Sequence, residues 1–184
     1  MTKSKRYGRM ESPVGRLTVG GDGEGLRVVE FERKGDRADA AARRGGADWI
    51  EDDGAPIVRD AIGELAAYFE GRLRRFTVEV AMEGTAFEVE AWEALRGIGY
   101  GEAISYGEQA RRMGRGPESA RAVGAANGRN PVAIVVPCHR VIGADGRLVG
   151  FGGGLDVKRW LLEHESKVCG RVGLFESEAV GASR

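Results

Sequence analysis

The amino-acid sequence predicts an α+β fold with two domains, and three observations lead to that prediction. Short apolar stretches separated by glycine-rich turns fill the first part of the chain, which indicates strands. Helical spacing of apolar residues dominates the later part, and one apolar run between two prolines interrupts it. We therefore expect an N-terminal structural domain over residues 1–83, a mainly helical domain over 84–170 and a flexible tail over 171–184.

The N-terminal domain should be a small sheet with a helix on it. Between residues 7 and 31 turn signals alternate with short apolar stretches, which predicts an antiparallel hairpin or meander. Residues 32–54 are rich in Gly, Arg, Asp and Ala and predict a loop with a short helical piece. Apolar residues then recur at helical spacing over 55–69, with Pro56 near the first turn, and 76–80 alternate like one more strand.

Three helices are expected next, over residues 87–98, 106–113 and 118–127. The last two are short and joined by a glycine turn, which suggests a helix-turn-helix, although the same geometry occurs in proteins that never touch DNA. The third helix consists mostly of small residues, and its one long basic side chain is Arg121. Such a helix is too bare to read a major groove by side chains, but it can approach sugar-phosphate closely while one arginine projects into the duplex.

The most informative segment is the apolar run Val132–Val136, which is followed by Pro137, Cys138, His139 and Arg140. The run is short and rich in β-branched residues, so we expect a covered strand that stops at Pro137 and delivers Cys138 to a pocket. A lone cysteine is more often a small core residue. Here His139 and the positive charge of Arg140 favour the thiolate, the reactive form, and make Cys138 a candidate nucleophile.

Composition limits the possible functions. With 42% hydrophobic and 30% charged residues the chain reads as a soluble globular protein, and the absence of a long apolar window or secretion signal predicts a cytoplasmic protein with no membrane partner. A net charge of zero argues against a strongly basic nucleic-acid coat. One local patch of arginines is opposed nearby only by Glu108 and Glu118; it comprises Arg111, Arg112, Arg115, Arg121 and Arg129.

Several motifs occur together at a specific spacing: Arg121–Asn127, Asn130-Pro131 and Pro137–Val141. Jointly they resemble the O6-alkylguanine-DNA alkyltransferases, also called methylated-DNA–protein-cysteine methyltransferases. The resemblance covers roughly half of the chain and includes further matching residues: Phe87, Trp92, Ser105, Tyr106, Gly150–Leu155, Lys158 and Leu161–Glu165. It implies an RNase H-like N-terminal domain and a helical C-terminal domain with a winged-helix-like helix-turn-helix.

The resemblance implies direct-reversal DNA repair. The protein would flip O6-alkylguanine, and also O4-alkylthymine, from double-stranded DNA and transfer the alkyl group irreversibly to Cys138, once per molecule. The chemistry agrees, because a stacked base cannot present its O6 substituent to a thiol and a polarisable thiolate displaces an alkyl group without a metal or redox cofactor. We expect a monomer with no cofactor. A Cys/His zinc site in the N-terminal domain is excluded, since no cysteine or histidine precedes Cys138.

Roles follow from the resemblance for individual residues. Cys138 matches the alkyl acceptor and His139 the base that activates it through a water molecule. Glu165 should complete this relay, because Lys158, Leu161, Leu162 and Glu165 share one stripe of the last helix. Without the family, Glu165 could equally be a solvated acid paired with Lys167.

Asn130 matches a hinge asparagine, Tyr106 the proton donor to the leaving guanine, and Arg121 the finger that fills the space of the flipped base. Tyr106 read alone could also be a core aromatic that begins a helix. The remaining residues that the resemblance assigns to substrate or DNA binding are Ala122, Gly124, Val141, Phe151, Gly152 and Lys158.

Three positions depart from the pattern of many relatives. Phe151 stands for a tyrosine and loses a hydroxyl, Gly152 stands for a serine and keeps only its backbone N–H, and Ala133 stands for a proline that packs on large alkyl groups. Two other functions stay open at this stage: a Cys/His/Glu hydrolase or transferase that turns over, and a non-enzymatic binder of DNA lesions. Members of the second class lack the acceptor cysteine, which this chain has.

Overall fold

The N-terminal half of the protein is a four-stranded sheet with the strand order β3-β2-β1-β4. The computed structural model describes residues 4–32 and 49–171. Strands β1 to β3 pair in antiparallel fashion and confirm the predicted meander, whereas β4 pairs parallel to β1. The strands are β1 (Lys5–Met10), β2 (Leu17–Asp22), β3 (Gly25–Phe31) and β4 (Trp49–Glu51).

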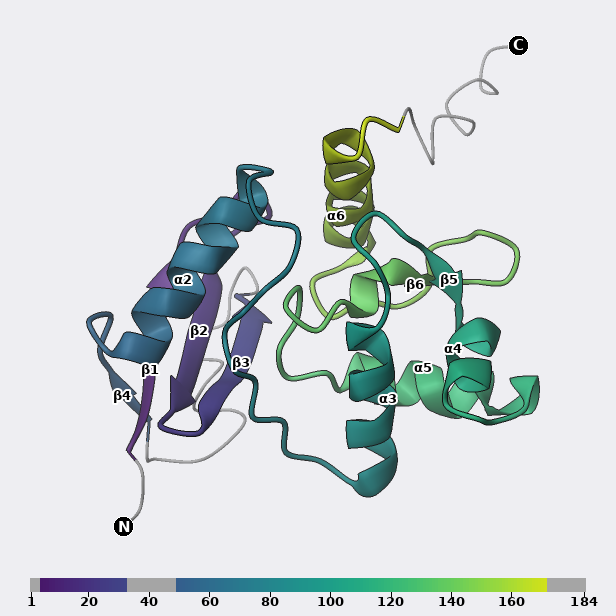
Figure 1. Ribbon diagram of the computed structural model, residues 1–184, viewed down its shortest axis with the longest axis horizontal. Helices are drawn as coiled ribbons and strands as arrows, with labels where there is room; N and C mark the ends of the chain where they lie inside the picture. Colours follow the sequence, from purple (N-terminus) through teal and green to yellow (C-terminus); the bar gives the residue numbers. More distant parts are fainter. Residues whose placement is uncertain (1–3, 33–48, 172–184) are drawn as a thin grey trace.

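Helix α2 (Pro56–Phe69) lies across one face of this sheet (Figure 1). It confirms the helix expected from the apolar spacing, and Pro56 occupies its first turn, where the missing N–H costs nothing. Its buried face includes Leu65 and Tyr68, both fully covered. Tyr68 thereby points away from solvent at the side of α2 that meets the second domain.

Two predictions for this domain were wrong. Residues 76–80 form no strand, because only Val80 bridges to Leu26, although Phe76, Val78 and Val80 still alternate toward the core and produce the strand-like pattern. Strand β4 instead lies within 32–54, where a loop was expected, and three residues are too few to show an alternation. The helical piece expected in that segment lies outside the described residues, as does nearly all of the tail over 171–184.

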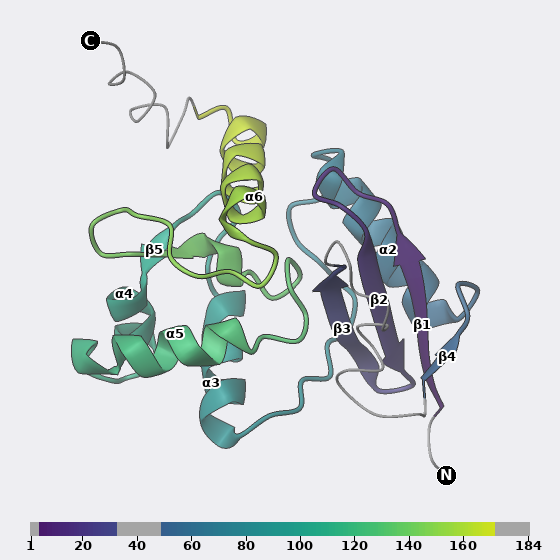
Figure 2. The same ribbon diagram turned by 180° about the vertical axis from the view of Figure 1, so that it is seen from behind.

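The C-terminal half is mainly helical and stands beside the sheet domain in both views (Figures 1 and 2), so the predicted α+β class is confirmed. A short parallel pair, β5 (Ile104–Ser105) with β6 (Val141–Ile142), joins distant segments of it. Its helices are α3 (Ala86–Arg96), α4 (Tyr106–Arg112), the 3-10 turn η1 (Pro117–Ser119), α5 (Ala120–Gly128) and α6 (Leu155–Val168). None of the helices in the described ranges is long and apolar enough to cross a membrane.

Local chemistry sets the ends of these helices. Thr85 and Glu88 form a reciprocal capping box that begins α3. Gly114, with φ of 71°, follows the end of α4 in the left-handed conformation that glycine adopts without strain. Helix α5 begins two residues later than predicted because Pro117–Ser119 first make a tighter 3-10 turn.

The apolar run Val132–Val136 is covered as expected but is not a strand. The chain reverses at Ile134, whose φ of 72° is unusual for a β-branched residue, and the Val136 N–H donates to the Val132 carbonyl at 2.9 Å. The Asn130 side chain explains the reversal, since it accepts from the Val132 N–H at 3.0 Å and donates to the Val136 carbonyl at 2.8 Å. One side-chain amide therefore replaces the strand ladder that the sequence pattern suggested.

Candidate active site

Cys138 lies directly after this reversal, at the first position of the 3-10 turn η2 (Cys138–Arg140). Only 8% of the residue is exposed, and its sulfur borders a hollow of about 240 Å³ together with Asn130, Phe151 and Gly152. The Asn130 Nδ2 that donates to the Val136 carbonyl also lies 3.2 Å from the Cys138 Sγ. Asn130 thus fixes the backbone of the reactive segment and contacts its sulfur with the same amide group.

The surroundings of Cys138 leave its thiol protonated at rest. Burial raises the pKa of Cys138 above its usual value, and the Asn130 hydrogen bond and the charge of Lys158 only partly oppose this effect. The expectation that Arg140 favours the thiolate was wrong, because its guanidinium donates to Glu165 and to the Ile98 carbonyl instead. The resting side chain is therefore a thiol that needs a base.

A candidate base is the next residue of η2, His139, which forms a buried pair with Glu165. His139 Nε2 lies 2.8 Å from Glu165 Oε1, and both side chains are fully buried. The alternative in which Glu165 is a solvated partner of Lys167 is therefore wrong. The stripe of α6 that carries Lys158, Leu161 and Glu165 is buried as predicted.

The carboxylate of Glu165 accepts hydrogen bonds from four residues. Besides His139, the donors are the Tyr68 hydroxyl at 2.8 Å, the Gly101 N–H at 2.9 Å and two nitrogens of Arg140, each at 2.9 Å. Burial alone would raise the pKa of Glu165, but the hydrogen bond from His139 and the hydrogen bonds and charge of Arg140 outweigh it and hold the pKa far below its usual value. Glu165 is therefore a carboxylate.

The hydrogen bonds determine the tautomer of His139. Burial lowers the pKa of His139, which keeps the ring neutral, and an ionised carboxylate can only accept, so Nε2 carries the proton. Nδ1 is then the ring nitrogen with a lone pair, and it has no hydrogen-bond partner within residues 4–32 and 49–171. Within the same residues the side chains of Cys138 and His139 share no direct hydrogen bond, in line with side chains of neighbouring residues that point apart.

Tyr106 and Lys158 hold the glycine-rich loop beside the thiol. Both donate to the Val149 carbonyl, from the Tyr106 hydroxyl at 3.2 Å and from the Lys158 Nζ at 2.8 Å. Burial raises the pKa of Tyr106 to about 12 and lowers the pKa of Lys158 to about 8. The prediction that Lys158 supports this loop is confirmed by its contact, whereas no contact in the structure tests the proton-donor role of Tyr106.

A second hollow of about 790 Å³ opens beside the first, between α5 and the same loop. Tyr106, Arg121 and Gly124 line it, and Phe151 and Gly152 belong to the walls of both hollows. A Cβ added at Gly124 would lie 3.5 Å from the Tyr106 ring, so a larger residue would narrow this space. The two hollows therefore share walls, and part of the predicted site lies along them between the exposed face of α5 and Cys138.

Arg121 differs from the other arginines of the predicted patch. Arg111 and Arg112 pair with Glu108, Arg112 also with Glu102, Arg115 with Glu90 and Arg129 with Glu88. The prediction that only Glu108 and Glu118 oppose the patch was therefore wrong. Arg121 is exposed and makes no ion pair or hydrogen bond with the part of the chain that the structure describes.

Two predicted site residues, Ala122 and Val141, line neither hollow, and two functional residues were not predicted. Ala122 is exposed beside Arg121 as expected for a DNA contact, but Val141 is fully buried in the β5–β6 pair and lines neither hollow. Sequence reasoning missed Tyr68 and Gly101, which bind Glu165 from distant segments. The only available signal was a tyrosine on the apolar face of a helix, since a buried hydroxyl needs a partner.

Two family models together match most of the chain. The model described as 6-O-methylguanine DNA methyltransferase, ribonuclease-like domain, matches residues 5–82. The model described as 6-O-methylguanine DNA methyltransferase, DNA binding domain, matches residues 86–167. Each half of the structure therefore corresponds to one of the two matched domains.

Full-length relatives are similar over the same range. A methylated-DNA–protein-cysteine methyltransferase of Methanosarcina acetivorans is 45% identical over 86% of this chain and 97% of its own length. The protein of that name from Mycobacterium bovis is 47% identical over 86% of this chain and 91% of its own. The structure also resembles the crystal structure of Mycobacterium tuberculosis OGT in complex with DNA, with a TM-score of 0.78, 45% identity and coverage of 89% of this chain and 94% of that one.

Proposed function

The chain belongs to the 6-O-methylguanine DNA methyltransferase family, and from that premise we propose that Cys138 is the acceptor to which it transfers the alkyl group. The protein is a DNA-repair alkyltransferase. The observation that carries the proposal for Cys138 is its position, between the buried His139–Glu165 pair and a hollow that continues to the exposed face of α5. Cys169, the other cysteine, lies near the end of α6 and borders neither hollow.

The transfer uses His139 as the base. Its unprotonated Nδ1 takes the thiol proton of Cys138 through a bridging water, and Glu165 stabilises the resulting imidazolium. The thiolate attacks the alkyl carbon, so that the C–S bond forms as the C–O6 bond breaks. Tyr106 donates a proton to the leaving guanine. The thioether has no route back to a thiol, and each molecule acts once.

DNA approaches at the face that carries α4, η1 and α5, which we assign as the helix-turn-helix. Ala122 and Gly124 allow close approach of the backbone, while Arg121 enters the duplex and fills the space of the flipped base. The freedom of Arg121 from ion pairs with described residues supports this role, because four neighbouring arginines of the patch are held by glutamates. The base then lies between the two hollows, with Phe151 and Gly152 beside it.

O4-alkylthymine is proposed as a second substrate, since its alkylated oxygen presents the same carbon to the thiolate. A monomeric state and a cytoplasmic location stay predictions from the sequence. The effect of Ala133 on the tolerated size of the alkyl group also stays a prediction. Ala133 borders the Cys138 hollow at the position where a proline would pack on larger alkyl groups.

Intact-mass and peptide-mass measurements test the acceptor. Incubation with duplex DNA that contains O6-methylguanine should add one methyl group per molecule, on the peptide that carries Cys138. Cys138→Ala should abolish the addition and retain DNA binding, whereas Cys169→Ala should be methylated like the native chain. Methylation at another residue, or repeated turnover by one molecule, would contradict the proposal.

A further inference from the structure

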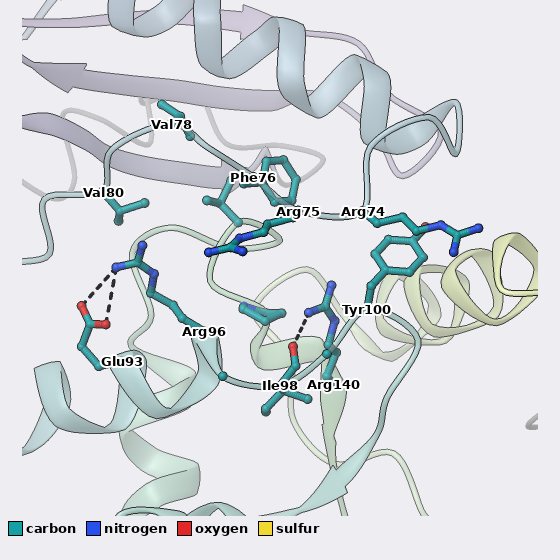
Figure 3. A pocket seen from close by; sticks show the side chains of 14 residues that line it. Arg74, Arg75, Phe76, Val78, Val80, Glu93, Arg96, Ile98, Tyr100 and Arg140 are labelled. Carbon is teal, nitrogen blue, oxygen red and sulfur yellow. Dashed lines mark hydrogen bonds and ion pairs between the residues drawn. The ribbon is translucent and has the colours of Figure 1, made fainter.

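Hollows lie on two sides of the reactive turn, and one of them borders the sulfur of Cys138. Figure 3 shows the other, a hollow of about 620 Å³ on the Arg140 side, where Arg140 donates to the Ile98 carbonyl at 2.7 Å. The described residues that line it do not include Cys138, and none of them lines the hollow of about 240 Å³ that Cys138 borders. An alkyl group that reaches the sulfur therefore occupies the 240 Å³ hollow.

The sheet domain supplies part of the wall of this Cys138 hollow. Val29 and Phe31 of β3 line it together with Ala133 and Phe151 of the helical domain. Phe31 is the last residue of β3 and is 8% exposed. The hollow has more room than a methyl group fills, and apolar side chains of this kind favour an apolar group over a charged one.

Two contacts fix the ring of Phe31. It meets the ring of Phe151 in a T-shaped arrangement, with ring centroids 5.5 Å apart and an angle of 62° between the ring planes. The backbone at Gly153 lies directly against the same ring, since a Cβ added there would lie 2.8 Å from it, which is closer than real Cβ atoms approach. A rotation of the Phe31 ring would disturb both contacts.

We propose that Phe31 is a specificity-determining residue, which forms with Phe151 the wall that contacts alkyl groups larger than methyl. This inference rests on the proposed role of Cys138 and names the substrate class of that site: O6-alkylguanines with a large apolar alkyl group, such as benzyl. A methyl group stays beside the sulfur, whereas a benzyl group extends beyond the reacting carbon into the hollow. Because Ala133 is small, the two rings are the large apolar surfaces of this hollow.

Two duplexes of one sequence, which contain either O6-methylguanine or O6-benzylguanine, test this wall. The rate of each transfer to Cys138 is followed by peptide mass, and the readout is the ratio of the benzyl rate to the methyl rate. Phe31→Ala should lower this ratio by roughly tenfold or more, a usual discrimination for a lost apolar contact in a pocket. Phe31→Leu keeps an apolar side chain and should lower it less. A general defect of the fold would slow both transfers equally and leave the ratio unchanged.

Phe69 offers a matched control. It also extends from the sheet domain to an aromatic ring of the helical domain, that of Trp160 in α6, with ring centroids 5.9 Å apart, but it lines neither the Cys138 hollow nor the one beside α5. Phe69→Ala should therefore keep the native ratio.

A ratio in the folded Phe31 variants that equals the native value, or exceeds it because the hollow is larger, would overturn the proposal. Where Phe31→Ala does not fold, the ratio of Phe31→Leu decides in the same way. Failure of the proposed function would give a different result, because neither duplex would then alkylate Cys138 of the native chain.

Discussion

Replacement of Glu165 by glutamine should strongly destabilise the protein although the two side chains have nearly the same shape. Five nitrogen or oxygen donors converge on the two carboxylate oxygens of Glu165, and an amide offers only one acceptor oxygen. The amide nitrogen would face other donors, and the buried cation of Arg140 would lose its counter-charge. Removal of one partner of a buried ion pair typically costs about 3–5 kcal/mol.

The expected change in thermal stability follows from this value. For a chain of this length each kcal/mol shifts Tm by roughly 2–4 °C, so Glu165→Gln should lower Tm by about 6–20 °C. The control is Glu163→Gln on the same helix, where the side chain is exposed and the substitution should change stability by less than about 0.5 kcal/mol. Equal Tm values for the two variants would show that the convergence on Glu165 contributes no net stability.

The same variant also has a defined pH dependence. The pKa of Glu165 is lowered on folding, so its carboxylate contributes stability above the unfolded pKa of about 4.3, and this contribution is lost as the pH falls toward the folded pKa. The stability difference between the native chain and Glu165→Gln should therefore be largest near neutral pH and shrink in acid.

Transfer from free O6-benzylguanine by the folded variant should slow by about 100-fold, a usual size for a disabled base.

Three further substitutions test separate parts of the site. Tyr68→Phe should lower the free energy of unfolding by about 1–3 kcal/mol in chemical denaturation, yet slow transfer only a few-fold, because Glu165 keeps its other donors; a loss as large as that of Glu165→Gln would contradict this ranking. Asn130→Ala should raise the pH midpoint of Cys138 alkylation by iodoacetamide, since the sulfur loses its donor, and an unchanged midpoint would remove Asn130 from the stabilisation of the thiolate. Arg121→Ala should slow repair of duplex DNA far more than reaction with free O6-benzylguanine, because only the duplex must be opened; equal slowing would mean that Arg121 shapes the pocket or the fold.

The sequence predicted the site better than it predicted the local backbone. Residues whose roles depend on spacing along one helix, such as Glu165 and Lys158, were placed correctly because helical periodicity is a local property. The run before Cys138 predicts a strand because β-branched residues are typical of strands, but they are equally typical of covered loops. The reversal at Ile134 depends on the Asn130 side chain, and no apolar pattern reports such a hydrogen bond.

Hydrogen-bond partners that are distant in sequence were the other feature that the sequence did not predict. Tyr68 lies 97 residues from Glu165 along the chain, and its hydrogen bond exists only because the sheet domain packs against α6. The activation of Cys138 by Arg140 was predicted because the two residues are close in sequence. In the 3-10 turn the Arg140 side chain binds Glu165 instead. Both contacts depend on tertiary geometry, which composition and sequence spacing do not report.

The same geometry explains why a domain without catalytic side chains accompanies the active site. Val29 of β3 pairs with the segment at Val132, and Tyr68 of α2 donates to Glu165, so the sheet domain contacts both the turn before Cys138 and the carboxylate that binds His139. The left-handed backbone at Ile134 costs free energy, of order 1–3 kcal/mol, and persists only where surrounding contacts determine it. Burial of Ile134 and the two hydrogen bonds of Asn130 supply those contacts. A protein that reacts once gains nothing from a mobile nucleophile, and a reactive turn held from two domains keeps the thiol in its attacking position before DNA arrives.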